Sequence, residues 1–285
     1  MIRSIRRHLS VPRIVLIAFL SAVGLFMLLP IIFLFNNAFK PLNELFLFPP
    51  TIFVQHPTWH NFEQLLLHST AGIVPFTRYL FNTVIISFVT VAAVILVSTM
   101  AGYVLSKHRF HFKALIMALI MISLMFTPQT VLIPRYLVIS NLGLVDTYFA
   151  HVLPFIASPV AVFLMKQFID QIPDALTEAA KLEGASELYM FTRIIIPLTA
   201  PAVATVSIIT FQAVYMDLEV SSTYMTKETM KTLAFYAQSF SINVSAAAGK
   251  SIAAAVGLLM FLPNLIVFLI FQRKMIQTML HSGVK

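Results

Sequence analysis

Residues 79–106 read YLFNTVIISFVTVAAVILVSTMAGYVLS and contain no Asp, Glu, Lys or Arg. The run is longer than the roughly 20 apolar residues that a helix needs to cross a bilayer. Five more runs are equally free of charge: 14–39, 114–134, 147–165, 194–216 and 251–272. Only helices and closed barrels satisfy the backbone in lipid, and these runs show no alternation with a period of two. The sequence therefore predicts an all-α, polytopic integral membrane protein.

The composition also indicates a lipid environment. The chain has 285 residues, of which 59% are hydrophobic and 11% charged, and its mean hydropathy is +0.90. A soluble core of this size could not bury so much apolar surface. The net charge is +8, but the basic residues lie in short segments between apolar runs and form no stripe, so no nucleic-acid partner is expected. The chain has no cysteine and therefore uses neither disulfides nor thiol chemistry.

We predict one transmembrane domain over 1–285, with six transmembrane helices. The predicted spans are about 14–36, 80–105, 114–134, 147–166, 194–220 and 251–272, and the longest external segment is 40–78. This segment holds Pro41, Pro49, Pro50, Pro57 and Trp59, and we expect a short amphipathic helix around 62–66. Pro128 and Pro134 lie close together in the third run and predict a bend there.

The distribution of basic residues predicts the orientation. With the N-terminus inside, 13 of the 19 Lys and Arg residues fall in cytoplasmic segments, and the positive-inside rule prefers this assignment to its inverse. The first run is too long for the apolar core of a secretory signal, so we expect an uncleaved first span. Both termini and the charged segment at 173–193 are then predicted to be cytoplasmic.

This charged segment lies within a loop at 170–196 and has the pattern of two short helices. Pro173 and Asp174 form a helix start, with Asp174 placed to cap free backbone N–H groups and Glu178 near the positive end of the helix dipole. Gly184 can take a positive φ and end that helix at about residue 183. A second helix from about Ser186 then leads into the fifth span. On a period of 3.6 one side holds Leu176, Ala179, Ala180 and Leu182, and the other holds Asp174, Glu178 and Lys181.

The order of residues in this segment carries a family resemblance. Glu178-Ala179-Ala180, then Gly184, then Ile194-Ile195-Ile196-Pro197 resembles the cytoplasmic coupling loop of membrane subunits of ABC importers. Further pieces of the same resemblance are Phe48-Pro49-Pro50, Trp59, Asn61-Phe62, Asn82-Thr83, Ile133-Pro134, Leu142-Gly143-Leu144, Thr147, Ala253-Ala254-Ala255, Pro263, Gln272-Arg273 and Gly283-Val284-Lys285. Over nearly its whole length the chain is similar to carbohydrate-type importer permeases, such as those for maltose and glycerol-3-phosphate.

The resemblance implies a permease subunit that translocates a sugar or related polyol across the cytoplasmic membrane of a prokaryote. Its implied partners are a second permease subunit, two ABC ATPase subunits and an extracellular or periplasmic solute-binding protein. ATP and Mg would be bound by the partner ATPase, and this chain would bind no cofactor and catalyse no reaction. The implied ATPase-coupling residues are Asp174, Glu178, Ala179, Ala180, Lys181, Gly184 and Pro197. The alternative for this segment is a solvated loop that merely connects two spans.

Other candidate chemistry in the sequence is weak. Lys250-Ser251 follows a glycine, as in a phosphate-binding loop, but Val244 stands where the first glycine is required. His56 and His60 are separated by a proline and lack a close third ligand, so we expect no metal site. His151 lies within a span, where a polar ring normally finds a hydrogen-bond partner. No convergent set of acid, base and nucleophile indicates an intramembrane enzyme.

Polar side chains at the end of the fifth span are the candidates for the substrate pathway: Gln212, Tyr215, Asp217 and Glu219. Carboxylates there are costly unless they face water, a basic partner or a ligand; alternatively, both carboxylates lie just outside the lipid and are solvated. Similar permeases have an aromatic residue followed by Asn and then Asp or Glu, whereas this chain has Tyr215-Met216-Asp217 and lacks the amide. An ion-gradient-driven secondary transporter is the alternative function. It would normally show inverted halves or charges deep in several spans, whereas these spans are almost free of charge.

Overall fold

The computed structural model describes residues 11–45, 47, 51, 53–71, 74–243 and 247–282. Every regular element in these residues is helical, and none of them forms a strand, so the predicted all-α class is confirmed. The α-helices are α1 (Val11–Phe39), α2 (Leu42–Leu45), α3 (His60–Ala71), α4 (Phe76–Lys107), α5 (Lys113–Ser123), α6 (Leu132–Asn141), α7 (Tyr148–Ile156), α8 (Pro159–Asp170), α9 (Asp174–Leu182), α10 (Glu187–Met190), α11 (Ile196–Leu198), α12 (Ala200–Tyr215), α13 (Glu219–Tyr224), α14 (Leu233–Asn243) and α15 (Ala247–Ser282). Two short 3-10 helices, η1 (Pro128–Val131) and η3 (Glu228–Met230), and one π-helix, η2 (Phe191–Ile195), complete the order. Phe48–Pro50 and Gly283–Lys285, which contribute to the resemblance, lie outside the described residues.

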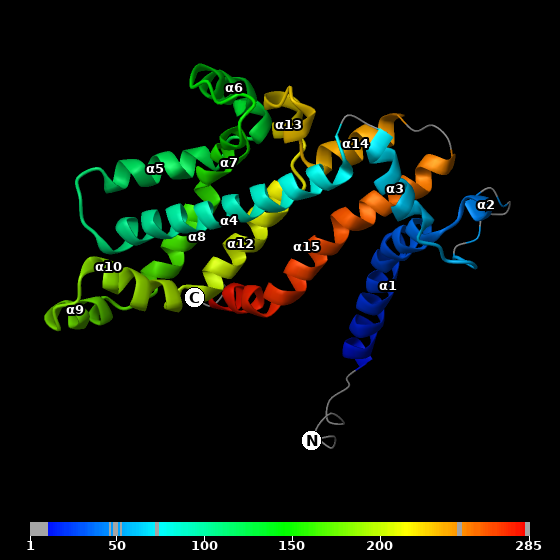
Figure 1. Cartoon of the computed structure of the whole chain (residues 1–285). Helices are drawn as coiled ribbons and strands as arrows, with labels where there is room; N and C mark the ends of the chain where they lie inside the picture. The colour runs from blue at the N-terminus through cyan, green and yellow to red at the C-terminus, as the bar shows by residue number, and fades with distance from the viewer. Residues whose placement is uncertain are drawn as a thin grey trace. The chain divides into compact units, whose positions relative to one another are not determined.

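Three described helices are long and apolar enough to cross a membrane: α1, α4 and residues 252–274 of α15 (Figure 1). Three bent pairs also pass this test when each is taken together. The helix axes turn by 109° between α5 and η1–α6, by 46° between α7 and α8, and by 76° between the 187–198 segment and α12. If each pair is one span, the number of spans reaches the six predicted, and that number stays a prediction.

The bend in the third predicted span is confirmed. Helix α5 ends at Ser123, and the chain turns before Pro128 starts η1. A proline lacks an N–H and its ring clashes with the preceding turn, which favours a break in the helix before it. The break between α7 and α8 was not predicted. There Ser158 accepts a hydrogen bond from the N–H of Ala161 at 3.3 Å and Pro159 occupies the first turn, which together start a new helix.

The described residues fall into two compact units. The first comprises residues up to 68 together with 239–259, and the second comprises 69–238 and 260 onward. In the first unit, the expected amphipathic helix is present as α3. The buried amide of Asn61 donates to the carbonyls of Ala38 and Lys40 at 2.8 and 2.9 Å, which fixes the start of α3 to the end of α1. Trp59 packs edge-on against Phe39, with ring centroids 5.0 Å apart.

In the second unit, α4 is the central helix and packs against α7, α8 and α12 (Figure 1). Val94 of α4 is fully buried in a core with Met165 of α8 and Val206 of α12. At Gly102 the two backbones come close, because a Cβ there would lie 3.0 Å from the Cβ of Met165. Small residues allow this kind of approach between membrane helices.

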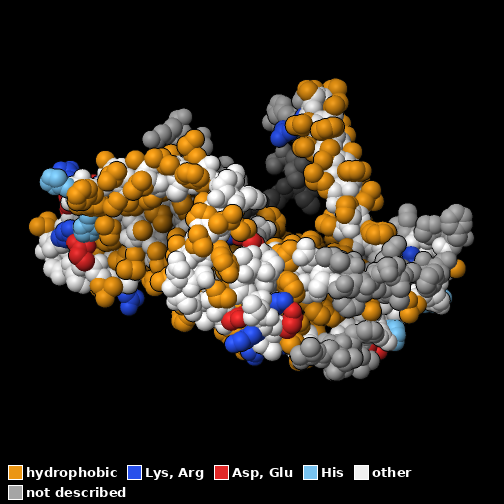
Figure 2. All heavy atoms as spheres, turned by 90° about the horizontal axis from the view of Figure 1, so that it is seen from above, with side chains coloured by type: hydrophobic (Ala, Val, Ile, Leu, Met, Phe, Trp, Pro, Cys, Tyr) orange, Lys and Arg blue, Asp and Glu red, His pale blue; other side chains and the backbone are white. Residues whose placement is uncertain are grey.

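Hydrophobic side chains cover much of the surface, as expected for a protein in lipid. Helix α1 has one buried residue, Ala38, and exposes large side chains such as Phe26. Figure 2 shows the molecule from above. On this face, acidic and basic side chains gather in small groups among hydrophobic ones. Exposed apolar surface on this scale indicates contact with lipid or with other membrane subunits.

Candidate functional site

The predicted coupling loop folds as two short helices joined by a glycine turn. Helix α9 ends at Leu182, and Gly184 has a φ of +78°, the left-handed conformation that glycine adopts without steric cost. The N–H of Gly184 donates to the carbonyl of Lys181, and the N–H of Ala185 to that of Ala180, at 3.0 and 2.9 Å. These two bonds close the helix end as expected. The second helix, α10, begins after Ser186, whose hydroxyl accepts from the N–H of Tyr189.

Asp174 is the first residue of α9, but its carboxylate caps no backbone N–H group. Instead it accepts a hydrogen bond from the ammonium of Lys107 at 2.6 Å. The Lys107 side chain is only 8% exposed, and its ammonium also donates to the carbonyl of Ile172. The hydrogen bond and charge of Lys107 lower the pKa of Asp174 below its ordinary value. The predicted capping role was therefore wrong, because a cation on another helix competes for the carboxylate more strongly.

A second contact ties α10 to the same end of α4. The hydroxyl of Tyr103 donates to Glu187 at 2.7 Å, and Lys181 of α9 approaches the other oxygen of Glu187 at 3.1 Å. His108 lies 3.6 Å from Glu187. The hydrogen bond from Tyr103, followed by those from the lysine, lowers the pKa of Glu187. Glu187 therefore stays ionised at neutral pH and joins α4, α9 and α10.

The outward side of the loop is open to contact. Thr177 is the only buried residue of α9, while Glu178, Ala179 and Lys181 are exposed. Large apolar side chains are also exposed on both helices, with Leu182 at 91% and Leu188 at 71%. Of the predicted apolar side of α9, only Ala180 is half-buried. An exposed apolar surface at a charged loop indicates a protein partner.

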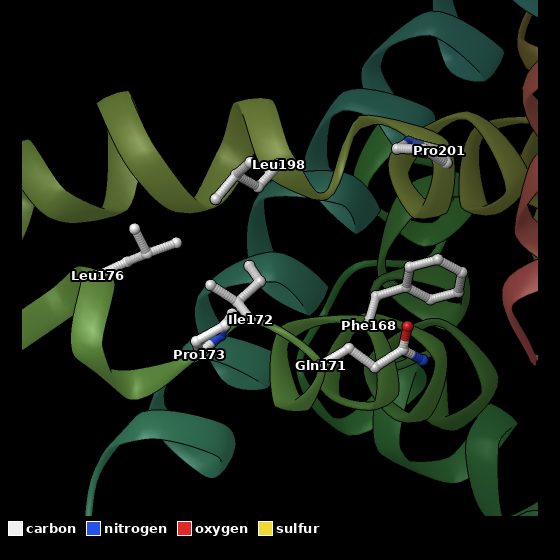
Figure 3. Close-up of a pocket in the computed structure, with 7 residues that line it drawn as sticks. All are labelled: Phe168, Gln171, Ile172, Pro173, Leu176, Leu198 and Pro201. Atoms are coloured by element: carbon white, nitrogen blue, oxygen red, sulfur yellow. The ribbon is translucent and has the colours of Figure 1, made fainter. Parts of the chain in front are cut away.

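A cavity of about 290 Å³ lies between α9 and the residues Leu198 of α11 and Pro201 of α12. Leu176 reaches into it from α9, and Leu198 and Pro201 line the opposite side (Figure 3). Phe168 and Gln171 close it from the end of α8. Helix α9 is therefore held at its N-terminal end by Lys107, with open space between Leu176 and α11.

Pro197 lies where the loop enters the membrane helix α12, just after a π-helix. The N–H of Ile196 donates to the carbonyl of Phe191, five residues back. A proline at 197 cannot donate to Arg193 and its ring crowds that carbonyl, so a widened turn before it relieves the clash. The sequence indicated the proline but not the π-helix.

The candidate pathway residues divide into two groups. Gln212 is exposed on α12, and the buried Tyr215 stacks on Phe211 with ring centroids 5.1 Å apart. Asp217 accepts from the N–H of Val220 at 3.0 Å and so caps α13. Glu219, the first residue of α13, forms an ion pair with a residue of another helix.

Glu219 pairs with Arg135 of α6, which the sequence did not single out. Arg135 also donates to the hydroxyl of Tyr224 at 3.2 Å. Glu219 therefore has a basic partner on another helix, and its place in the substrate pathway stays a prediction. No signal in the sequence could link residues 84 positions apart without knowledge of the helix packing.

A polar network on the opposite end of α4 was also missed. The fully buried amide of Asn82 donates to the carbonyls of Thr229 and Lys231, both at 2.9 Å, and accepts from the hydroxyl of Tyr148 at 2.8 Å. His151 finds the expected partner here, since its ring lies 3.0 Å from the carbonyl of Met230. Asn82 contributed to the family resemblance, but its role was not predicted.

Comparisons with known proteins agree with this architecture. Residues 93–277 match the family described as the binding-protein-dependent transport system inner membrane component. The putative ABC transporter permease protein ORF2 of Caldicellulosiruptor sp. (strain Rt8B.4) is 30% identical over 271 residues, which cover 94% of this chain and 95% of the relative. The arabinooligosaccharides transport system permease protein AraQ of Bacillus subtilis (strain 168) is 28% identical over 280 residues, or 97% of each chain. A solved bacterial ABC transporter involved in the import of the acidic polysaccharide alginate has the same fold, with a TM-score of 0.80 at 20% identity over 91% of this chain and 95% of the other.

Proposed function

Because the chain belongs to the family of inner-membrane components of binding-protein-dependent transport systems, we propose that it is a permease subunit of an ATP-driven importer that takes up a sugar or related polyol. A second permease subunit, two ABC ATPase subunits and a solute-binding protein complete the proposed assembly. The chain catalyses no reaction in this assembly. ATP and Mg are bound and used by the ATPase subunits.

The observation that carries this proposal is the way the coupling loop is held. Helices α9 and α10 expose Glu178, Leu182 and Leu188 to a partner. The same helices are fixed on their inner side to α4 through Lys107 and Tyr103. A loop that merely connected two spans would need neither the exposed apolar surface nor these ties. We infer that an ATPase subunit docks on the outward side of this loop and that its ATP-driven closure moves the loop.

The substrate class is inferred from the relatives and from the chemistry of the pathway candidates. AraQ is named for arabinooligosaccharides, and the solved neighbour imports a polysaccharide. Gln212, Tyr215 and Asp217 offer an amide, an aromatic face and a carboxylate, which suit the hydroxyls and apolar faces of sugars. We propose that these residues and Glu219 border the pathway. The amide that similar permeases carry before the carboxylate is replaced by Met216, so the specificity of those permeases does not transfer.

The test of this function is uptake in a reconstituted importer. Glu178→Lys reverses a charge on the exposed side of α9, and we expect it to abolish both solute uptake and ATPase association while membrane insertion persists. The matched control is Glu63→Lys on α3, an exposed glutamate of the external segment. Uptake that proceeds at the normal rate without any ATPase subunit would contradict the proposal and favour an ion-gradient-driven carrier.

The solute itself can be identified through the binding protein. Purification of the importer from its native membrane should also yield the solute-binding protein, and mass spectrometry of its bound ligand would name the cargo. Alanine variants of Asp217 and Glu219 that still assemble should then change substrate preference. Unaltered preference in both variants would remove these residues from the pathway.

A further inference from the structure

Helix α4 is tied at its inner end to the proposed coupling loop. Four residues form this connection, which we call the inner latch: Tyr103, Lys107, Asp174 and Glu187. The ammonium of Lys107 and the hydroxyl of Tyr103 reach the two carboxylates at 2.6 and 2.7 Å. Ser106 adds a third bond to this end of α4, since its hydroxyl donates to Asp170 at 2.6 Å. Any displacement of α9 and α10 therefore acts directly on the last turn of α4.

The other end of α4 is tied to a segment that lies far away in the sequence. We call residues 226–233 the outer segment. Asn82 donates to two of its carbonyls at 2.9 Å, and Arg78 donates to that of Thr229 at 3.1 Å. Thr83 accepts from the N–H of Leu233 at 2.7 Å. The first turns of α4 thus hold the backbone of the outer segment at several points.

The outer segment presents polar groups at the surface. Lys227 and Thr229 are exposed, while Lys231 is buried in a pair with Glu228 and lies 4.0 Å from the centre of the Phe235 ring. Asp146 accepts from the N–H groups of residues 226 and 227, which ties the start of the segment to the connection between α6 and α7. The outer segment is therefore a defined surface and not a free loop.

Nothing in α4 interrupts the connection between its two ends. The helix has 32 residues and no proline, so at about 1.5 Å per residue it is about 48 Å long. The other two long spanning helices contain Pro30 and Pro263, and the three bent pairs turn by 46° or more. Among the described elements, α4 is the uninterrupted helix that connects the inner latch to the outer segment.

The sides of α4 are suited to small sliding movements. Its buried residues include Ser87, Thr90, Ser98 and Gly102, which are small and follow helical spacing. The buried hydroxyls of Ser87 and Thr90 have no hydrogen-bond partner among the described residues, so no bond there holds α4 in one register. Small residues along this part of α4 offer little steric resistance to a small shear between packed helices, whereas Val94 packs in the core with Met165 and Val206.

From this geometry we propose that α4 transmits the movement of the coupling loop to the outer segment, with Tyr103 and Lys107 as the positioning residues at its input and Asn82 at its output. This inference rests on the proposed function, because it assumes that an ATPase moves the loop. It adds that the conformation of residues 226–233 changes with the nucleotide state of the ATPase at the inner face. Helix α4 is then the shared element whose displacement couples the two faces.

The absence of native cysteine allows a direct test. Lys227→Cys places one thiol of this chain on the exposed outer segment. Its rate of modification by a membrane-impermeant maleimide is measured in the full importer, in proteoliposomes, with and without ATP trapped by vanadate. In the otherwise unaltered chain the rate should differ between the two states. In the same chain carrying Lys107→Ala and Tyr103→Phe, this difference should disappear.

Two control variants distinguish a defect in folding or assembly from a loss of the movement transmitted by α4. Arg109→Ala removes a neighbouring exposed cation whose charge reaches Asp174 only at a distance, without a salt bridge among the described residues, and it should preserve most of the nucleotide dependence. Lys107→Arg keeps the charge that pairs with Asp174 and should restore most of the nucleotide dependence of labelling. Co-purification of the ATPase subunits confirms that each variant assembles.

The outcomes separate the inference from the proposed function. A latch variant that assembles with the ATPase and keeps the full nucleotide dependence at Lys227→Cys would overturn the role of α4. If the unaltered chain neither binds the ATPase nor takes up solute with ATP, the proposed function fails instead. If that chain transports normally but its outer segment is labelled at the same rate in both states, the inference alone is wrong.

Discussion

At the scale of single residues, the backbone restricts the choice of side chain at Gly184. Its φ is +78°, and a Cβ placed there would meet nothing within 4 Å, so the restriction comes from the backbone and not from crowding. A β-branched residue in this conformation costs about 1–2 kcal/mol. We expect Gly184→Val to abolish coupled uptake by misplacing α10, while Gly184→Asn, which tolerates the left-handed region, keeps most of it.

The comparison of these two variants isolates the backbone effect. Both add a side chain at the same exposed position, so a difference between them reports the cost of positive φ. Uptake and ATPase co-purification are measured at equal membrane levels. Equal loss in both variants would show that the partner needs the bare glycine surface and not the turn.

Asn82 is the residue whose removal should cost most on the opposite end of α4. Asn82→Leu takes away two donors and one acceptor from a buried network. Each buried polar group left without a partner costs about 1–3 kcal/mol. We therefore expect a clear fall in the thermal unfolding temperature of the purified importer.

Ser87→Ala is the matched control for Asn82. Ser87 lies five residues further along α4 and is equally buried, but its hydroxyl has no partner among the described residues. Its loss should leave the unfolding temperature nearly unchanged. Equal shifts for the two variants would mean that burial, and not the hydrogen-bond network, sets the stability of this region.

The ionisation of the inner latch predicts how coupling depends on pH. The pKa values of Asp174 and Glu187 lie below their ordinary values of 3.8 and 4.5 in the folded protein. Groups with a lowered pKa stabilise the fold above their unfolded pKa, and that contribution is lost as pH falls through the folded value. Both carboxylates therefore stay ionised from about pH 8 to about pH 6. Over this range we expect their ionisation to cause no change in ATPase association with membranes that contain the permease. A midpoint near neutral pH that disappears in Asp174→Asn would contradict this assignment.

At the scale of elements, the cavity beside α9 offers a test of how the loop moves. We expect the ATPase to push Leu176 towards Leu198, into the open space between them. Leu198→Trp would fill that space, and overpacking costs about 1–3 kcal/mol. A cost of this size lowers the population of the state in which Leu176 has moved against residue 198 about 5- to 150-fold.

The readout for the cavity variant is the rate of uptake at constant ATPase association. Leu198→Met conserves the volume and serves as the control, with nearly normal uptake expected. Normal uptake by Leu198→Trp would show that α9 does not approach α11 during the cycle.

The elements also show what the sequence could and could not predict. Helix α9, its end at Gly184 and the break before Pro128 depend on local rules, so they were predicted within a few residues. The break at Ser158 has a local cause that the long apolar run concealed. The pairing of Lys107 with Asp174 depends on the packing of α4 against α8, which no local pattern encodes.

The same limit applies to the pathway candidates. Gln212, Tyr215 and Asp217 are close in sequence and could be grouped by type. Arg135, the partner of Glu219, comes from another helix, and only the fold brings the two together. Long-range polar pairs of this kind need a structure, whereas spans, turns and helix ends can be predicted from the chain alone.

At the scale of the whole molecule, the orientation in the membrane is a prediction. The inner latch adds which segments must lie on the same side. Lys107, Asp174 and Glu187 lie together, so the end of α4 and the coupling loop must share one side of the membrane. An uninterrupted α4 of about 48 Å spans the roughly 30 Å hydrocarbon core and places Lys227 on the other side. The excess of basic residues predicts that the latch side faces the cytoplasm.

Single-cysteine labelling in intact cells tests this assignment on the natural cysteine-free background. We expect an impermeant maleimide to modify Lys227→Cys in whole cells and Glu183→Cys only after permeabilisation, because both side chains are exposed but on opposite faces. The inverse pattern would place the coupling loop outside, where no ATPase could reach it. Such a result would contradict the orientation and the proposed coupling mechanism together, since the mechanism requires α9 to meet a nucleotide-driven partner in the cytoplasm.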